Sequence, residues 1–125
     1  MDNTNKKKKI LLVDDDEIHL IIAENILQPE YEITKVKSGK EALQLIYKGF
    51  IPHLVLLDIL MPDMDGWETY NRLKTIALLY DVPIVFLTSV DEKKEMAQAL
   101  EMGIADYIIK PYQREDLLNR IKKLL

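Results

Sequence analysis

The sequence contains no cysteine among its 125 residues. That absence excludes disulfide bonds, thiolate nucleophiles and zinc sites built on cysteine. Long hydrophobic runs are missing too, since no apolar stretch approaches the roughly 20 residues that a membrane-spanning helix needs. No segment has the pattern of a signal peptide. We therefore expect a soluble, cytoplasmic protein that does not contact a membrane.

Clustered positive charge is scarce as well. The chain has 17 basic and 21 acidic residues, and its one basic run, Lys6 to Lys9, lies in a polar stretch at the start. Nucleic-acid binding needs clustered Lys and Arg to neutralise phosphates, so we expect no direct nucleic-acid partner. We predict a flexible basic N-terminal tail over residues 1–8 and a single domain over 9–125. Because the last predicted helix reaches the end of the given sequence, we expect no second domain.

Strand-like apolar runs alternate with helix-like segments five times. The predicted strands are 9–13, 32–36, 54–57, 84–87 and 106–109, and the predicted helices are 17–27, 40–47, 67–78, 92–101 and 114–124. Runs that are apolar throughout are typical of parallel strands covered by helices on both faces. The alternation therefore predicts a doubly wound, five-stranded parallel α/β sheet of the flavodoxin-like kind, with strand order 2-1-3-4-5.

Residues that start and stop helices support this division of the chain. Three pairs have the spacing of N-terminal capping boxes: Ser38 with Glu41, Asp65 with Glu68, and Ser89 with Glu92. Gly49 and Gly103 follow helical runs at places where a left-handed residue ends a helix. These signals predict where the helices begin and end.

Polar side chains stand at the ends of four predicted strands. Asp14 and Asp15 follow the first strand, Asp58 the third, Thr88 the fourth and Lys110 the fifth. The first and third strands are neighbours in this topology, so their carboxylates converge at one edge of the sheet. Two carboxylates about 4 Å apart repel by roughly 4 kcal/mol at an effective dielectric of 20, which favours a bound cation. Hard oxygen ligands without nearby His or Cys favour Mg²⁺.

Asp58 is the candidate nucleophile of a phosphoryl-transfer site. Carboxylates act as phosphoryl acceptors, and a metal ion beside Asp58 would screen the charge of an approaching phosphate. Lys110 is suited to binding a phosphoryl oxygen or Asp58 itself, and the Thr88 hydroxyl is suited to donating to the same group. The alternative is purely local: the acidic run Asp14 to Glu17 then only complements the positive end of the following helix.

Taken together and in this order, the motifs resemble the receiver domain of the response-regulator family, the phosphoacceptor half of two-component signalling. The resemblance covers residues 9–125. It rests on the acid pair after Ile10–Val13, the segment Leu57 to Gly66, the run Leu87 to Ser89, and the stretch Gly103 to Pro111. It implies a phosphoryl donor: the phosphohistidine of a sensor histidine kinase or of a histidine phosphotransfer protein, as in a phosphorelay. It also implies that the chain is not a turnover enzyme.

The resemblance further implies a role for each site residue. Asp58 is then the phosphorylation site; Asp14, Asp15, Asp58 and the backbone carbonyl of Leu60 hold Mg²⁺; Lys110 and Thr88 bind the phosphoryl oxygens; and Tyr107 is the switch aromatic, which turns inward when Thr88 moves toward the phosphate. In this family the residues two places after the acceptor and two after the switch hydroxyl influence hydrolysis of the phosphoryl group. Here they are Leu60 and Val90, which cannot orient a water, so we predict slow self-dephosphorylation.

The first predicted helix is apolar nearly all round, although a surface helix normally shows only an apolar stripe. Some of its apolar side chains must face outward beside the acidic residues. By resemblance to receivers that meet phosphotransfer domains, we predict a partner-docking surface at Ile18, His19 and Ile22; the alternative is a tightly covered core helix. We also expect a downstream protein target, and either a monomer or a dimer that depends on phosphorylation.

Three other functions stay open at this point. An unphosphorylated pseudo-receiver would use the same fold only as a binding module. An aspartyl-phosphate phosphohydrolase normally carries a second aspartate two residues after its nucleophile, where this chain has Leu60. A flavodoxin-like cofactor binder would need a phosphate loop rich in hydroxyls and glycine after the first strand, where this chain has four acids.

Overall fold

A computed structural model describes residues 6–125. Its strands are β1 (Lys9–Val13), β2 (Glu32–Val36), β3 (Leu54–Leu57), β4 (Ile84–Thr88) and β5 (Asp106–Ile109). Its helices are α1 (Glu17–Leu27), α2 (Gly39–Tyr47), α3 (Gly66–Lys74), the 3₁₀ turn η1 (Ala77–Leu79), α4 (Lys93–Met102) and α5 (Arg114–Leu124). Residues 1–5 of the predicted tail lie outside the described residues. Within 6–125 no helix is both long enough and apolar enough to cross a membrane.

The five strands form one parallel sheet in the order β2-β1-β3-β4-β5, which confirms the predicted fold. β1 pairs with β3 in a register that sets Val13 opposite Leu57. The next residue on each strand is therefore an aspartate. This register brings the first and third predicted strand ends together at the carboxyl edge of the sheet.

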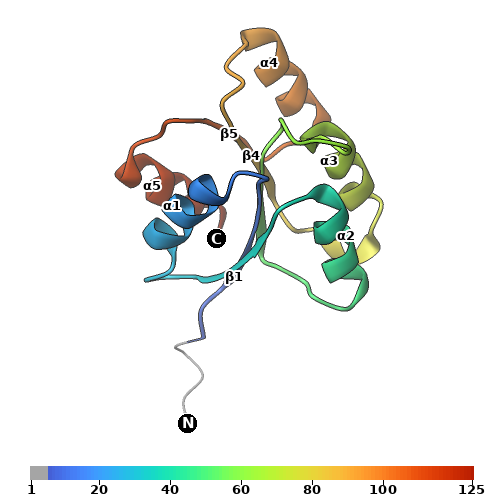
Figure 1. The fold of residues 1–125 in the computed structure, drawn as a ribbon, viewed down its shortest axis with the longest axis horizontal. Coiled ribbons are helices and arrows are strands. Elements are labelled where there is room, and N and C mark those ends of the chain that lie inside the picture. The colour runs from blue at the N-terminus through green and yellow to red at the C-terminus, as the bar shows by residue number, and fades with distance from the viewer. Residues whose placement is uncertain (1–5) are drawn as a thin grey trace.

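Two helical layers cover the sheet, as Figure 1 shows with α1 and α5 on one side and α2 and α3 on the other. Neighbouring strand residues belong to the two layers: Ile10 lies in the core cluster that includes residues of α1 and α5, whereas Leu11 lies in the cluster that includes residues of α2, α3 and α4. Both faces of β1, β3 and β4 are therefore buried, as their continuous apolar runs predict. The buried sheet is a rigid support for the polar residues at its edge.

In two of the three predicted capping boxes, the first residue caps its helix. The Ser38 hydroxyl accepts a hydrogen bond from the backbone N–H of Glu41, and the Asp65 carboxylate accepts one from that of Glu68. Gly103 ends α4 with a φ of 106°, in the left-handed region that favours glycine, as predicted. These interactions place the start of α3 directly after the loop that follows Asp58.

The third capping box is wrong, and so is the length of the third helix. α4 begins at Lys93 without a side-chain cap, because the Thr88 hydroxyl accepts the backbone N–H of Val90 and turns the chain before any helix begins. The predicted helix 67–78 is divided into α3 and η1. The break follows Thr75, whose hydroxyl and backbone N–H both donate to the carbonyl of Arg72.

Candidate functional site

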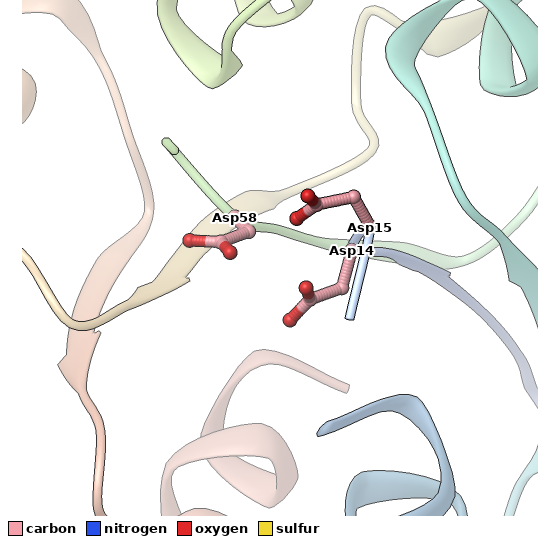
Figure 2. A group of neighbouring side chains, drawn as sticks. All are labelled: Asp14, Asp15 and Asp58. Atoms are coloured by element: carbon pink, nitrogen blue, oxygen red, sulfur yellow. The ribbon is translucent and has the colours of Figure 1, made fainter. Parts of the chain in front are cut away.

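Three carboxylates converge at the carboxyl edge of the sheet (Figure 2). Asp14 follows β1 and Asp58 follows β3, and both are almost fully buried, at 6% and 7% exposed. Asp15 stands beside them and is exposed. One oxygen from each of the three lies within 4.8 Å of the others. The structure thus brings together the predicted acid cluster.

This donor set fits a magnesium ion. Three carboxylates with hard oxygen atoms at mutual distances below 4.8 Å suit a small, hard dication that keeps several of its waters. Two of the three are buried and the third opens to solvent, which leaves a side for those waters and for a phosphate. The part predicted for the backbone carbonyl of Leu60 stays a prediction; the Leu60 side chain itself is exposed.

Gly66 lets the chain turn tightly enough to hold Asp58 in place. A Cβ atom at this position would lie 2.4 Å from the carbonyl oxygen of Asp58 and 2.7 Å from the Cα of Ile59. The backbone N–H of Gly66 donates to the carbonyl of Ile59 over 2.8 Å, and the N–H of Ile59 donates to Oδ1 of Asp58, also over 2.8 Å. Oδ1 is therefore occupied by the backbone, and Oδ2 faces the other site residues.

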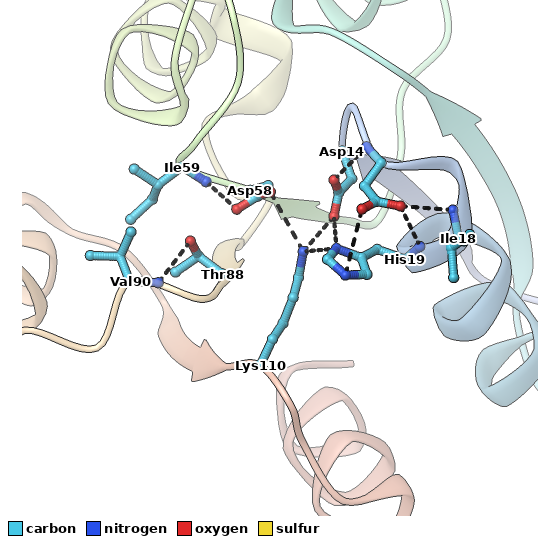
Figure 3. A network of polar contacts seen from close by, with 9 residues as sticks. Asp14, Ile18, His19, Asp58, Ile59, Thr88, Val90 and Lys110 are labelled. Atoms are coloured by element: carbon cyan, nitrogen blue, oxygen red, sulfur yellow. Dashed lines mark hydrogen bonds and ion pairs between the residues drawn. The ribbon is translucent and has the colours of Figure 1, made fainter.

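Lys110 reaches the acid cluster from the end of β5, across β4 and β3 (Figure 3). Its Nζ lies 2.6 Å from Oδ2 of Asp14 and 3.5 Å from Oδ2 of Asp58. The Lys110 side chain is only 10% exposed. The ammonium is thus a buried counter-charge that lies closer to Asp14 than to the candidate nucleophile Asp58. The Lys110–Pro111 peptide bond is cis.

Burial dominates the electrostatics of Asp58. It raises the pKa of the Asp58 carboxyl above its ordinary value, while the Lys110 ammonium acts in the opposite direction and the Asp14 carboxylate adds to the increase. The ionised site therefore carries unfavourable negative charge that one lysine compensates only in part. A divalent cation would compensate the remainder.

Thr88 and Tyr107 lie on the far side of Asp58 from the acid pair. Thr88 is the last residue of β4 and is fully buried, with its hydroxyl accepting the N–H of Val90 over 3.3 Å. The Tyr107 ring points inward and is 4% exposed, and its hydroxyl donates to the carbonyl of Val90 over 2.6 Å. Burial raises the pKa of Tyr107 to about 12. Val90 thus connects the predicted hydroxyl and the predicted switch aromatic.

Helix α1 presents the predicted docking residues beside this site. Ile18 is 66% exposed and Ile22 is 47% exposed, so the apolar side chains do face outward as predicted. A groove next to them is lined by His19, Ile22, Ile26, Lys110, Pro111 and Tyr112. Leu87, Ser89 and Arg114 complete its lining, so the groove is mostly apolar with charged groups at Lys110 and Arg114. Their role in docking stays a prediction.

Comparison with known proteins identifies the family. The family model described as the response regulator receiver domain matches residues 10–122. The chain belongs to this family. The match includes the carboxyl ends of all five strands, so the receiver domain includes every polar residue of the site described above.

Individual relatives agree with this assignment. The chain is 37% identical over 122 residues to the Pyropia yezoensis protein named probable transcriptional regulator ycf27, covering 97% of the chain and 49% of that protein. It is 34% identical over 119 residues to the chemotaxis protein CheY of Halobacterium salinarum, covering 94% and 97%. The solved structure of the chemotaxis protein CheY4 of Vibrio cholerae superposes with a TM-score of 0.88 at 26% identity, covering 95% and 99%. The receiver spans about half the length of the ycf27 relatives and nearly all of the CheY relative.

One contact at the candidate site was not predicted from the sequence. His19, predicted only as a docking residue, lies with its Nδ1 3.0 Å from Nζ of Lys110 (Figure 3). The sequence signal was weak: side chains in the first turn of a helix point back toward its N-terminus, where Asp14 and Asp16 stand. No local pattern shows that Lys110 arrives there from a strand at the other edge of the sheet.

Proposed function

We propose that this receiver accepts a phosphoryl group on Asp58 from a phosphohistidine, with Mg²⁺ bound at Asp14, Asp15 and Asp58. The observation that carries the proposal is the juxtaposition of a buried carboxylate with a second buried carboxylate and a buried ammonium at one sheet edge. Membership of the receiver family supports it. The donor would be a sensor histidine kinase or a histidine phosphotransfer protein.

In the transfer, Oδ2 of Asp58 is the attacking atom because Oδ1 is held by the N–H of Ile59. A bond forms between Oδ2 and phosphorus while the bond between phosphorus and the donor's imidazole nitrogen breaks. The electron pair stays on that nitrogen, and the ring leaves as neutral imidazole because its other nitrogen carries a proton during the transfer. Bound Mg²⁺ would supply charge neutralisation for the phosphoryl oxygens. Lys110 has only to move its Nζ from Asp14 toward the new phosphoryl group, and Thr88 can donate its hydroxyl proton to another oxygen.

We expect this reaction to switch the protein rather than to turn over substrate. Leu60 is exposed and apolar, and Val90 is apolar, so neither side chain can activate a water that would attack the phosphoryl group. The phosphoryl group should therefore persist. Its presence would be transmitted from Thr88 to Tyr107, because the hydroxyl groups of both residues are hydrogen-bonded to the backbone of Val90.

A partner protein would read this change. Movement of Thr88 would pull on the Val90 backbone and so on the Tyr107 hydroxyl, altering the surface made by α4, β5 and α5. We propose that a downstream protein, or a second phosphorylated copy of the chain, binds there. The phosphoryl donor would instead dock on Ile18, His19 and Ile22, beside the entrance to Asp58.

Trp67 fluorescence offers the test. Trp67 is the second residue of α3, and its indole packs edge-on against Phe86, with ring centroids 5.2 Å apart. Phe86 in turn packs against Tyr107, with centroids 6.0 Å apart. Wild type and Asp58→Asn are titrated first with Mg²⁺ and then with beryllofluoride, which mimics a phosphoryl group on an aspartate. We expect a Mg²⁺ response in wild type that beryllofluoride extends, and no extension in Asp58→Asn. A folded wild type that responds to neither would instead support an unphosphorylated binding module.

A further inference from the structure

His19 is held against the ammonium of Lys110. Its Nδ1 lies 3.0 Å from Nζ of Lys110, and 3.7 Å from the same Asp14 oxygen that accepts the Lys110 hydrogen bond. An ammonium can only donate. Nδ1 of His19 is therefore the acceptor in this contact, and the ring proton resides on Nε2. Lys110 thus has two close acceptors on the β1 side of the site, and one at 3.5 Å on the Asp58 side.

Asp16 lies beside this ring at the start of α1. One Asp16 oxygen caps α1 by accepting the backbone N–H groups of Ile18 and His19, over 2.9 and 3.3 Å. The other oxygen lies 3.7 Å from Nε2 of His19, the atom that carries the ring proton. The backbone N–H of Asp16 itself donates to Oδ1 of Asp14. The cap, the ring and the acid pair therefore form one connected arrangement at the start of α1.

We propose that His19 is a positioning residue that retains Lys110 on Asp14, away from Asp58, until a cation enters the site. The inference rests on the proposed function, since it concerns how the site is prepared for phosphoryl transfer. It assigns His19 a role distinct from docking: the Nδ1 acceptor sets where the ammonium stands. Lys110 and a cation then compete for the same Asp14 carboxylate.

The competition predicts a specific effect on metal binding. A cation that takes Asp14 must displace Lys110, and the Nδ1 hydrogen bond opposes that displacement. His19→Leu removes the acceptor, so Lys110 leaves Asp14 more readily and Mg²⁺ should bind roughly three- to tenfold more tightly, equivalent to about 0.7–1.4 kcal/mol. His19→Asn should keep near wild-type affinity, because the Asn oxygen can occupy the place of Nδ1.

The experiment is a double-mutant cycle read by Mg²⁺ dissociation constants, from Trp67 fluorescence and calorimetry without any phosphoryl donor. The variants are wild type, His19→Leu, His19→Asn, Lys110→Met and the His19→Leu/Lys110→Met pair. The proposal requires that His19→Leu tighten binding only when Lys110 is present. Unchanged or weaker binding in His19→Leu overturns it. An equal effect in the Lys110→Met background, or His19→Asn behaving like His19→Leu, overturns it as well.

Phosphorylation by acetyl phosphate distinguishes the positioning role of His19 from a docking role and from the proposed function itself. Acetyl phosphate is too small to need the docking surface, so at sub-saturating Mg²⁺ His19→Leu should react faster than wild type by the factor found for metal affinity. A loss confined to protein donors would leave docking as the only role of His19 and overturn the positioning role. If wild type takes no phosphoryl group at all, the proposed function fails, while the affinity cycle still decides the position of Lys110.

Discussion

Replacing Lys110 with methionine removes the ammonium shared by Asp14 and Asp58 and keeps most of the side-chain volume. Without it, two buried carboxylates face each other with oxygen atoms no more than 4.8 Å apart. At an effective dielectric of 20, two unit charges at that distance repel by about 3.5 kcal/mol. Removing one partner of a buried ion pair typically costs about 3–5 kcal/mol. We therefore expect Lys110→Met to lower the free energy of unfolding by about 3 kcal/mol in EDTA.

Chemical denaturation in EDTA and in Mg²⁺ measures this loss. Mg²⁺ should stabilise Lys110→Met by more than it stabilises wild type, because the cation replaces the missing counter-charge. Coupling energies from double-mutant cycles with Asp14→Asn and Asp58→Asn should be larger for Asp14, whose oxygen lies 2.6 Å from Nζ, than for Asp58 at 3.5 Å. Lys123→Met, at an exposed position on α5, is the control and should change stability by less than about 0.5 kcal/mol.

Two results would refute the reasoning. A loss of less than about 1 kcal/mol in EDTA would mean that the carboxylates do not need the ammonium, against the magnitude expected for a buried pair. Equal stabilisation of wild type and Lys110→Met by Mg²⁺ would mean that the cation and Lys110 do not act on the same charges.

Three further perturbations test the supports of the site. Tyr107→Phe should lower the free energy of unfolding by about 1 kcal/mol in urea, because it leaves the partly buried carbonyl of Val90 without its donor; no loss would contradict that hydrogen bond. Gly66→Ala should weaken Mg²⁺ binding strongly in calorimetry, since its Cβ meets the Asp58 backbone; wild-type affinity would contradict the close approach. Burial raises the pKa of Asp58, so its ionisation destabilises the fold as pH rises through that pKa. Asp58→Asn should therefore be more stable than wild type in EDTA at neutral pH, by an excess that shrinks on acidification; a constant difference would contradict the shift.

The strand ends were predictable because they depend on topology alone. Alternating strands and helices imply one parallel sheet, and neighbouring parallel strands end at the same edge. The convergence of Asp14 and Asp58 follows from that rule, and the register of Val13 with Leu57 confirms it. The start of α3 was predictable for a different reason: the Asp65 cap is a local contact with the backbone N–H of Glu68 and depends on no distant residue.

Competition between local interactions was not predictable. Ser89 has the spacing of a cap, but the Thr88 hydroxyl accepts the N–H of Val90, and α4 begins only at Lys93. Likewise, a lysine at a strand end can turn toward any acceptor within its length. Lys110 lies closer to Asp14 and His19 than to Asp58. This position depends on side chains from separate segments of the chain, and no sequence periodicity predicts it.

The most direct measurement of the central claim is the mass of the intact chain after incubation with acetyl phosphate. The account predicts a gain of one phosphoryl group in wild type that requires Mg²⁺, maps to Asp58 after borohydride trapping, and disappears in Asp58→Asn. No gain in a folded, Mg²⁺-saturated wild type, or an equal gain in Asp58→Asn, would contradict the assignment of Asp58 as the phosphoryl acceptor.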